Sequence, residues 1–233
     1  SDPVKREKHV VSWLDSIKDS AKSIYLVGDV FDFWWEYKKV VPRGFTRFLG
    51  KISELSDSGI DVHFFAGNHD MWIGNYLNEE CGMILHTSPL TTTLQNKVIH
   101  IAHGEGLGVK DRSYMVLLWI FRNRFARRLY SALHPSFGVG LAHRWSLSSR
   151  LAKNYSSEFL GPDNEALFKY ANGILENKKV DYFIFGHRHI ALDHATGESS
   201  RIFIMGNWFN APSYVSIDEK GAAELITYPY PSS

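Results

Sequence analysis

Four short apolar runs in this chain each end directly in a motif of potential metal-binding side chains. The runs are Ile24–Val27, Val62–Ala66, Val98–Ala102 and Tyr182–Phe185, and their β-branched and aromatic content is typical of buried strands. The motifs that follow them are Gly28-Asp29, Gly67-Asn68-His69-Asp70, His103-Gly104 and Gly186-His187-Arg188-His189. Because layered α/β proteins build their sites at the C-terminal ends of strands, the pattern predicts a layered α/β fold with its site at one sheet edge.

The side chains in these motifs are carboxylate, amide and imidazole groups. A single His or Asp after a strand is usually a hydrogen-bonded turn residue, and Gly-Asn or Gly-Asp alone is ordinary turn sequence. Core packing gives no reason for four such motifs at four strand ends. Oxygen and imidazole donors together suit a pair of Mn, Fe or Zn ions better than one structural zinc. The sequence therefore predicts a site for two divalent metal ions.

The order and spacing of these motifs, including Gly28-Asp29-x-x-Asp32, resemble the calcineurin-like metallophosphoesterase superfamily. The resemblance implies a β-sandwich flanked by helices and a two-metal centre in which Asp29 bridges the ions. It also implies that the metal ligands in this chain are Asp29, Asn68, His103, His187 and His189. The two ions are expected to be Mn²⁺, with Fe or Zn as alternatives.

The resemblance gives His69 and Asp70 catalytic roles. His69 would donate a proton to the leaving oxygen, and Asp70 would orient the His69 imidazole. A helix N-cap or turn acceptor is the alternative for Asp70. His187 and His189 alternate along an extended segment, so they can serve neighbouring ions only if the backbone turns between them.

Three further polar residues are weaker candidates for supporting roles. Asp32 is expected to hold a ligand or a loop rather than a metal. Glu105 stands where the superfamily usually has Asp after His-Gly, so its role is open. Asn207, after Ile204-Met205-Gly206, is a candidate to contact the ligand shell.

One superfamily motif has no counterpart near the start of the chain. An Asp-x-His at the end of an initial strand is expected, but Asp2 is followed by Pro3 and has no His two positions later. Either the strand lies upstream of Ser1 or the first metal half-site is degenerate. We favour the first interpretation, because the strand would be central and its loss would leave a cleft in the core.

Within the superfamily, the stretch Gly28–Trp34 and the region after His103 resemble the diphosphatases that act on UDP-2,3-diacylglucosamine in lipid A synthesis, in particular their Bacteroidetes type. This implies hydrolysis to lipid X (2,3-diacylglucosamine 1-phosphate) and UMP by a cytoplasmic enzyme on the inner-membrane surface of a Gram-negative bacterium. The partners would be the lipid-linked nucleotide and that surface, with no obligate protein partner. A net charge of +1 argues against nucleic-acid binding.

Residues 105–159 are expected to form a helical insertion, with 1–104 and 160–233 as the core of a single domain. The insertion interleaves basic and aromatic residues, and Leu117–Phe121 is an uninterrupted apolar run. It is therefore an αα-hairpin with solvated arginines, a membrane-surface helix, or a lid that holds acyl chains while arginines bind a diphosphate. The run is wider than one core-facing stripe requires, which favours the last two interpretations. The residues expected to contact substrate are Arg112, Tyr114, Arg122 and Arg150.

Hydrophobic periodicity predicts the remaining elements. Helices are expected at 4–19, 45–58 and 163–177, and strands at 61–66, 82–86, 91–94, 97–102, 180–185, 201–206, 214–217 and 223–228. The single cysteine, Cys81, excludes an internal disulfide and is expected to be a small buried hydrophobe.

Two other functions fit parts of the pattern. A phosphoesterase for a soluble nucleotide or phosphoprotein would share the metal site but would have no use for an apolar lid. A non-catalytic scaffold would explain the absent Asp-x-His, but it gives no reason for the Asn68-His69 pair.

Overall fold

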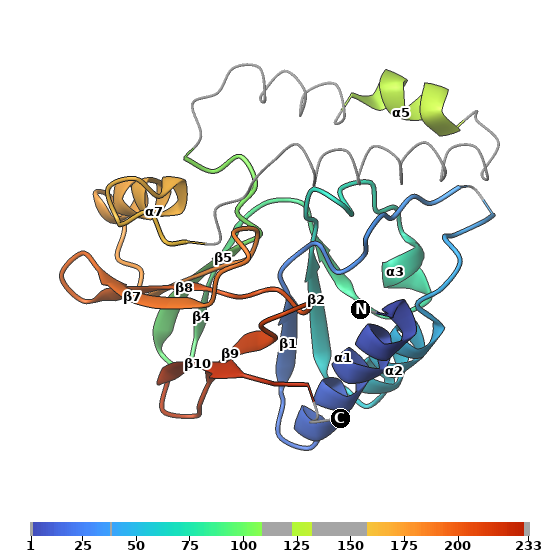
Figure 1. Cartoon of the computed structure of the whole chain (residues 1–233), viewed down its shortest axis with the longest axis horizontal. Helices are drawn as coiled ribbons and strands as arrows, with labels where there is room; N and C mark the ends of the chain where they lie inside the picture. Colours follow the sequence, from blue (N-terminus) through green and yellow to red (C-terminus); the bar gives the residue numbers. More distant parts are fainter. Residues whose placement is uncertain (1, 38, 109–122, 132–157, 231–233) are drawn as a thin grey trace.

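The computed structural model of the chain describes residues 2–37, 39–108, 123–131 and 158–230 (Figure 1). Its first sheet is parallel and consists of β1 (Ser23–Leu26), β2 (Asp61–Phe65) and β3 (Ile84–His86). The second has the order β4-β5-β6-β8-β7, with β4 (Leu90–Leu94), β5 (Lys97–Ala102), β6 (Tyr182–Phe185), β7 (Leu192–Thr196) and β8 (Ser200–Ile204). The third is the hairpin of β9 (Ser213–Ile217) and β10 (Ala223–Thr227).

The first two sheets pack face to face. Val27 and Phe65, at the ends of β1 and β2, share one buried cluster with Ile99, Ile101 and Phe203 of the second sheet. Within the second sheet β5, β6 and β8 run parallel, and only its outer strands are antiparallel. The C-terminal ends of β1, β2, β5 and β6 therefore meet at one end of the sandwich, which is the arrangement that the sequence predicts.

Helices cover the outer faces of the sandwich. On the first sheet, α1 (Pro3–Ile17) and α2 (Thr46–Asp57) lie side by side, and α3 (Tyr76–Glu79) precedes β3 (Figure 1). The start of α1 has Pro at its first position, and the side chain of Asp2 accepts the N–H of Val4 at 2.9 Å, which is a standard N-terminal cap. The cluster under these two helices includes Leu14, Ile52, Leu55, Val62 and Phe64, all at most 1% exposed.

The outer face of the second sheet is covered by α7 (Ala166–Leu175). Its buried side chains Leu167, Phe168 and Ala171 pack in one cluster with Phe183 and Phe185 of β6. This packing fixes α7 against the strand that leads into His187.

One helix of the expected insertion is described, α5 (Arg124–Ser131). Its Tyr130 ring lies 4.5 Å from Trp35 and 5.5 Å from Trp72, between centroids, whereas Phe125 and Leu129 are 70% and 62% exposed. Most of residues 105–159, including Arg112, Tyr114, Arg122 and Arg150, lies outside the described residues, so the cap and its substrate contacts stay predictions. In the described parts of the chain, no helix is both long and apolar enough to cross a membrane.

The elements expected from periodicity are present, with ends that differ by a few residues. The hairpin before His103 turns at Gln95 and Asn96, whose φ values of 48° and 59° suit a two-residue hairpin turn. Strand β7 was not predicted, because Leu-Asp-His-Ala-Thr is half exposed at a sheet edge and lacks a β-branched run. Cys81 is 3% exposed, which confirms its expected burial.

Candidate metal centre

Asp70 ties together the loops that follow β1 and β2. Its carboxylate is fully buried and accepts backbone N–H groups from Gly67 at 2.6 Å, Val30 at 2.9 Å, Asp29 at 3.3 Å and Phe31 at 3.4 Å. Burial and the neighbouring Asp29 charge raise the pKa of Asp70 to about 7, although the N–H groups favour the carboxylate. These bonds make Asp70 a backbone anchor. Its predicted orientation of the His69 ring stays a prediction.

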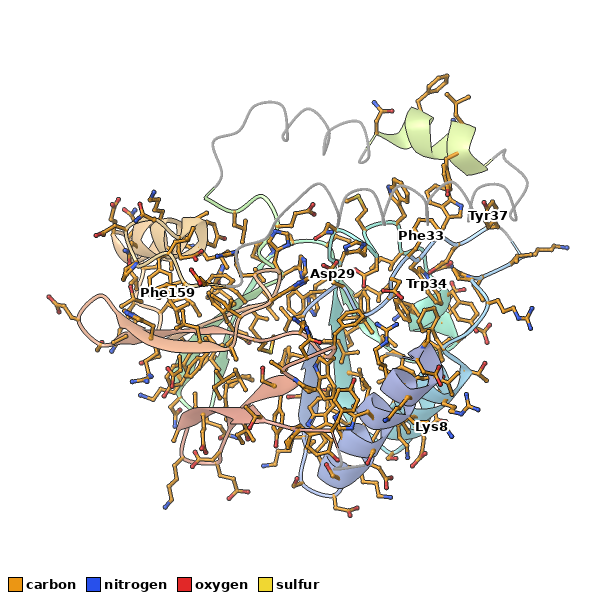
Figure 2. The ribbon with its side chains drawn as sticks, in the orientation of Figure 1. Lys8, Asp29, Phe33, Trp34, Tyr37 and Phe159 are labelled. Atoms are coloured by element: carbon orange, nitrogen blue, oxygen red, sulfur yellow. The ribbon has the colours of Figure 1, made fainter. Side chains whose placement is uncertain are left out.

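Asp29 projects from the turn after β1, where its φ is +52° (Figure 2). One carboxylate oxygen accepts the backbone N–H of His69 at 2.9 Å, and the other lies 3.3 Å from Nε2 of His103. Burial acts to raise the pKa of Asp29, but the charges of His103 and His69 outweigh it and hold the pKa well below its usual range. Asp29 is therefore an ionised carboxylate at the end of the sandwich.

His103 is oriented by the backbone of the opposite sheet. Its Nδ1 donates to the carbonyl of Val27 at 2.8 Å, so Nε2 faces Asp29 and lies 3.3 Å from Oδ1 of Asn68. A histidine that donates one ring N–H to a carbonyl presents the other nitrogen to a metal. Burial opposes a charge on His103, yet Asp29 raises the pKa of His103 to about 9. An incoming cation must therefore displace a proton from this nitrogen.

Asn68 and His187 complete the convergence of donor atoms. Nδ1 of His187 lies 3.1 Å from Oδ1 of Asn68, and the rings of His187 and His103 are 5.1 Å apart. The donor atoms of Asp29, His103 and His187 all lie within 4.8 Å of one another. Two ligand atoms that each lie about 2.1 Å from one ion, at right angles, are roughly 3 Å apart. The separations of 3.1 and 3.3 Å between neighbouring donor atoms therefore fit a divalent cation.

The other sequence candidates lie less centrally. His189 is exposed and is not a member of the Asp29–His103–His187 group found among the described residues. Asp32 lies 3.7 Å from the guanidinium of Arg6, which suits its expected role in holding a loop. The Asn207 side chain accepts N–H groups of its own turn.

The backbone between the two histidines turns, as their joint use requires. His187 and His189 have φ values of +62° and +57°, and the N–H of Arg188 donates to the carbonyl of Gly186 at 2.7 Å. Arg188 itself pairs with the buried carboxylate of Glu165, a contact that the sequence analysis missed. The position of Arg188 between two candidate ligands indicates that it could support the site, but its partner Glu165 is 23 residues away in the sequence and could not be identified from the motif.

Known proteins resemble this chain along nearly its whole length. The family model described as calcineurin-like phosphoesterase matches residues 1–191. The chain belongs to the calcineurin-like phosphoesterase family. Membership in this family implies divalent metals, in agreement with the donor geometry of the site.

Three proteins that share one name are similar to this chain. A protein of Porphyromonas gingivalis named UDP-2,3-diacylglucosamine hydrolase is 44% identical over 232 residues, which covers 94% of this chain and 88% of that protein. Proteins of the same name from Shewanella pealeana and Haemophilus influenzae are 28% and 26% identical, and each alignment covers at least 93% of this chain and 90% of the relative.

Proposed function

We propose that this protein hydrolyses UDP-2,3-diacylglucosamine to 2,3-diacylglucosamine 1-phosphate and UMP, a step of lipid A biosynthesis. The observation that carries the proposal is the 44% identity, over nearly the full length of both chains, with a hydrolase of that name. The convergence of Asp29, Asn68, His103 and His187 supports it, because a phosphoesterase of this family needs a divalent metal there.

The proposed chemistry assigns each described residue a task. Asp29, Asn68, His103 and His187 would hold divalent cations, most simply Mn²⁺, and His189 would serve a second ion. When bound, these ions supply a water of lowered pKa and neutralise charge on the phosphoryl oxygens. Attack at the α-phosphorus accounts for UMP as a product. His69 donates its proton to the departing phosphate oxygen of the lipid product, and Asp70 keeps the loops of Asp29 and His69 in register.

The proposed reaction is tested by UMP release from the acylated lipid by purified protein with Mn²⁺, with and without a chelator. We expect chelator-sensitive release, and a rate at least 100-fold lower with the deacylated head group, because each lost CH₂ contact is worth about 0.8 kcal/mol. Equal rates on the two compounds would indicate a soluble substrate. No release from either, together with no activity on a simple phosphodiester, would favour a non-catalytic scaffold.

We also propose that the protein works at the inner-membrane surface, on the cytoplasmic side, and that α5 contacts the lipid. Phe125 and Leu129 are one helical turn apart and largely exposed, and the basic residue Arg128 beside them is exposed as well. A helix with exposed apolar and basic residues binds anionic interfaces. Tyr130 meanwhile packs against Trp35 and Trp72, which attaches the helix to the core.

Membrane contact is tested by sedimentation with vesicles that contain phosphatidylglycerol. Phe125→Ser combined with Leu129→Ser should lower the partition coefficient at least tenfold, since burying one such side chain contributes about 1.5–3 kcal/mol. Val4→Ser removes another apolar side chain, 43% exposed, from α1 and should have little effect. Unchanged binding of the α5 variant would exclude this helix as the contact.

A further inference from the structure

We propose that the ion pair between Arg188 and Glu165 is a positioning device that holds His187 in the geometry needed to bind metal. Arg188 lies between the two histidines of the loop that follows β6, and Glu165 directly precedes α7. The inference rests on the proposed function only in requiring a metal centre, and it is independent of the lipid substrate.

The loop that carries His187 is conformationally costly. Both His187 and His189 occupy the left-handed region, at φ +62° and +57°, and a three-residue turn closes between Gly186 and Arg188. A non-glycine residue in this region costs about 1–2 kcal/mol. Such a backbone persists only when its surroundings hold it in place. Without an external restraint, we expect the loop to relax and His187 to move away from Asn68.

Arg188 supplies that restraint through a two-point contact. Its Nε donates to one carboxylate oxygen of Glu165 at 2.9 Å, and its Nη2 donates to the other at 2.7 Å. The same Nη2 also donates to the backbone carbonyl of Glu158 at 3.3 Å. A bidentate arginine–carboxylate pair fixes orientation as well as distance. The loop is therefore held in one direction relative to Glu165.

Glu165 is itself rigidly placed. It is 2% exposed, and the carboxylate oxygen that meets Nη2 also accepts the N–H of Leu160 at 3.2 Å. Burial acts to raise the pKa of Glu165, but the contact with Arg188 holds the pKa below its usual value. Glu165 directly precedes α7, the helix that packs on β6. The loop that carries His187 follows β6. The loop and the carboxylate that restrains it are therefore attached to the same packed pair of helix and strand.

The start of α7 also lies directly behind the metal ligands. A Cβ added to Gly104, the residue after His103, would lie 3.2 Å from Leu167 and 3.4 Å from the Cβ of His187. The first turn of α7 therefore bounds the space that contains both histidines. A shift of Glu165 relative to Arg188 would be transmitted to His187 over a short distance.

The test measures Mn²⁺ affinity by titration calorimetry on the whole, metal-stripped protein. Glu165→Gln and Arg188→Gln should each weaken Mn²⁺ binding about 10–100-fold, as is usual when a partner of a metal ligand is lost. The double variant should be no weaker than the singles, because both remove the same contact. Arg188→Lys keeps the charge without the fork and should give an intermediate loss.

The matched control is the exposed pair of Arg201 and Asp193, which joins β8 and β7 of the same sheet at 2.7 Å. Arg201→Gln should leave Mn²⁺ affinity within twofold of the wild type. If the Glu165 and Arg188 variants lower Tm but bind Mn²⁺ as tightly as the wild type, the ion pair only stabilises α7 and the inference is wrong. A wild type that binds no Mn²⁺ would also overturn it.

The same experiment separates this inference from the proposed function. A wild type that binds Mn²⁺ but releases no UMP would contradict the proposed lipid substrate and leave the metal centre unaffected. Weaker Mn²⁺ binding by the Glu165 and Arg188 variants would then still support the role of the ion pair in positioning His187. Activity measured at saturating Mn²⁺ gives a second readout, because a variant that only loosens a metal ligand should regain most of its kcat there.

Discussion

Asp29→Asn is expected to lower kcat/KM for the lipid substrate by roughly 10³-fold, about 4 kcal/mol of transition-state stabilisation. Asparagine keeps the size of the side chain and an oxygen that can accept the His69 N–H. It removes the negative charge that faces Nε2 of His103 at 3.3 Å. Mn²⁺ affinity should fall in parallel, because the site loses its one carboxylate within the group formed with His103 and His187.

The control for this variant is Asp193→Asn, which removes a carboxylate from the exposed pair with Arg201. It should change kcat/KM and Mn²⁺ affinity by less than twofold. The two measurements belong together, because a loss of activity with full Mn²⁺ affinity would place Asp29 outside the metal shell. Full activity of Asp29→Asn would contradict the assignment of a metal centre to this end of the sandwich.

Gly67→Ala is expected to destabilise the fold by about 3 kcal/mol and to abolish Mn²⁺ binding. Gly67 is buried, and a Cβ added there would collide with the carboxylate and backbone nitrogen of Asp29. The obstacle is the chain itself, so a rotamer change of one side chain cannot relieve it. The loop after β2 would have to move away from the loop after β1, and Asp70 would lose the N–H groups that it accepts from the loop of Asp29.

Gly50→Ala provides the matched control within the same chain. Gly50 lies inside α2, and nothing lies within 4 Å of a Cβ placed there. Alanine in a helix interior is preferred over glycine by up to about 1 kcal/mol, so this variant should be more stable. Urea unfolding of both variants checks the opposite signs, and a mild effect of Gly67→Ala would show that the two loops are loosely packed.

The four central residues of the site were predictable because the signal is local. Asp29, Asn68, His103 and His187 each follow an apolar run by one or two residues, and parallel strands bring their ends to one edge. Fold class and most elements followed from the same periodicity. The short edge strand β7 did not, because exposure at an edge removes the pattern.

Roles that depend on distant partners were not predictable in this way. Asp70 stands in the Gly-Asn-His-Asp motif, yet its hydrogen bonds to the loop of Asp29 span 39 to 41 residues. The pairing of Arg188 with Glu165 joins a loop to a helix start across 23 residues. Residue type identifies such groups as polar, but only packing decides which partner each one meets.

The sequence by itself determined the chemistry available to this protein: carboxylate, amide and imidazole groups at the ends of buried strands, because strand patterns and turn glycines are encoded over a few neighbouring residues. The tertiary structure alone decided which histidine of the last motif joins the group of Asp29 and His103. His187 and His189 belong to one short motif, but the folded loop leaves His189 exposed and brings His187 to within 3.1 Å of Asn68. The contact of His187 with Asn68 joins residues 119 positions apart, so it is set only when distant segments pack.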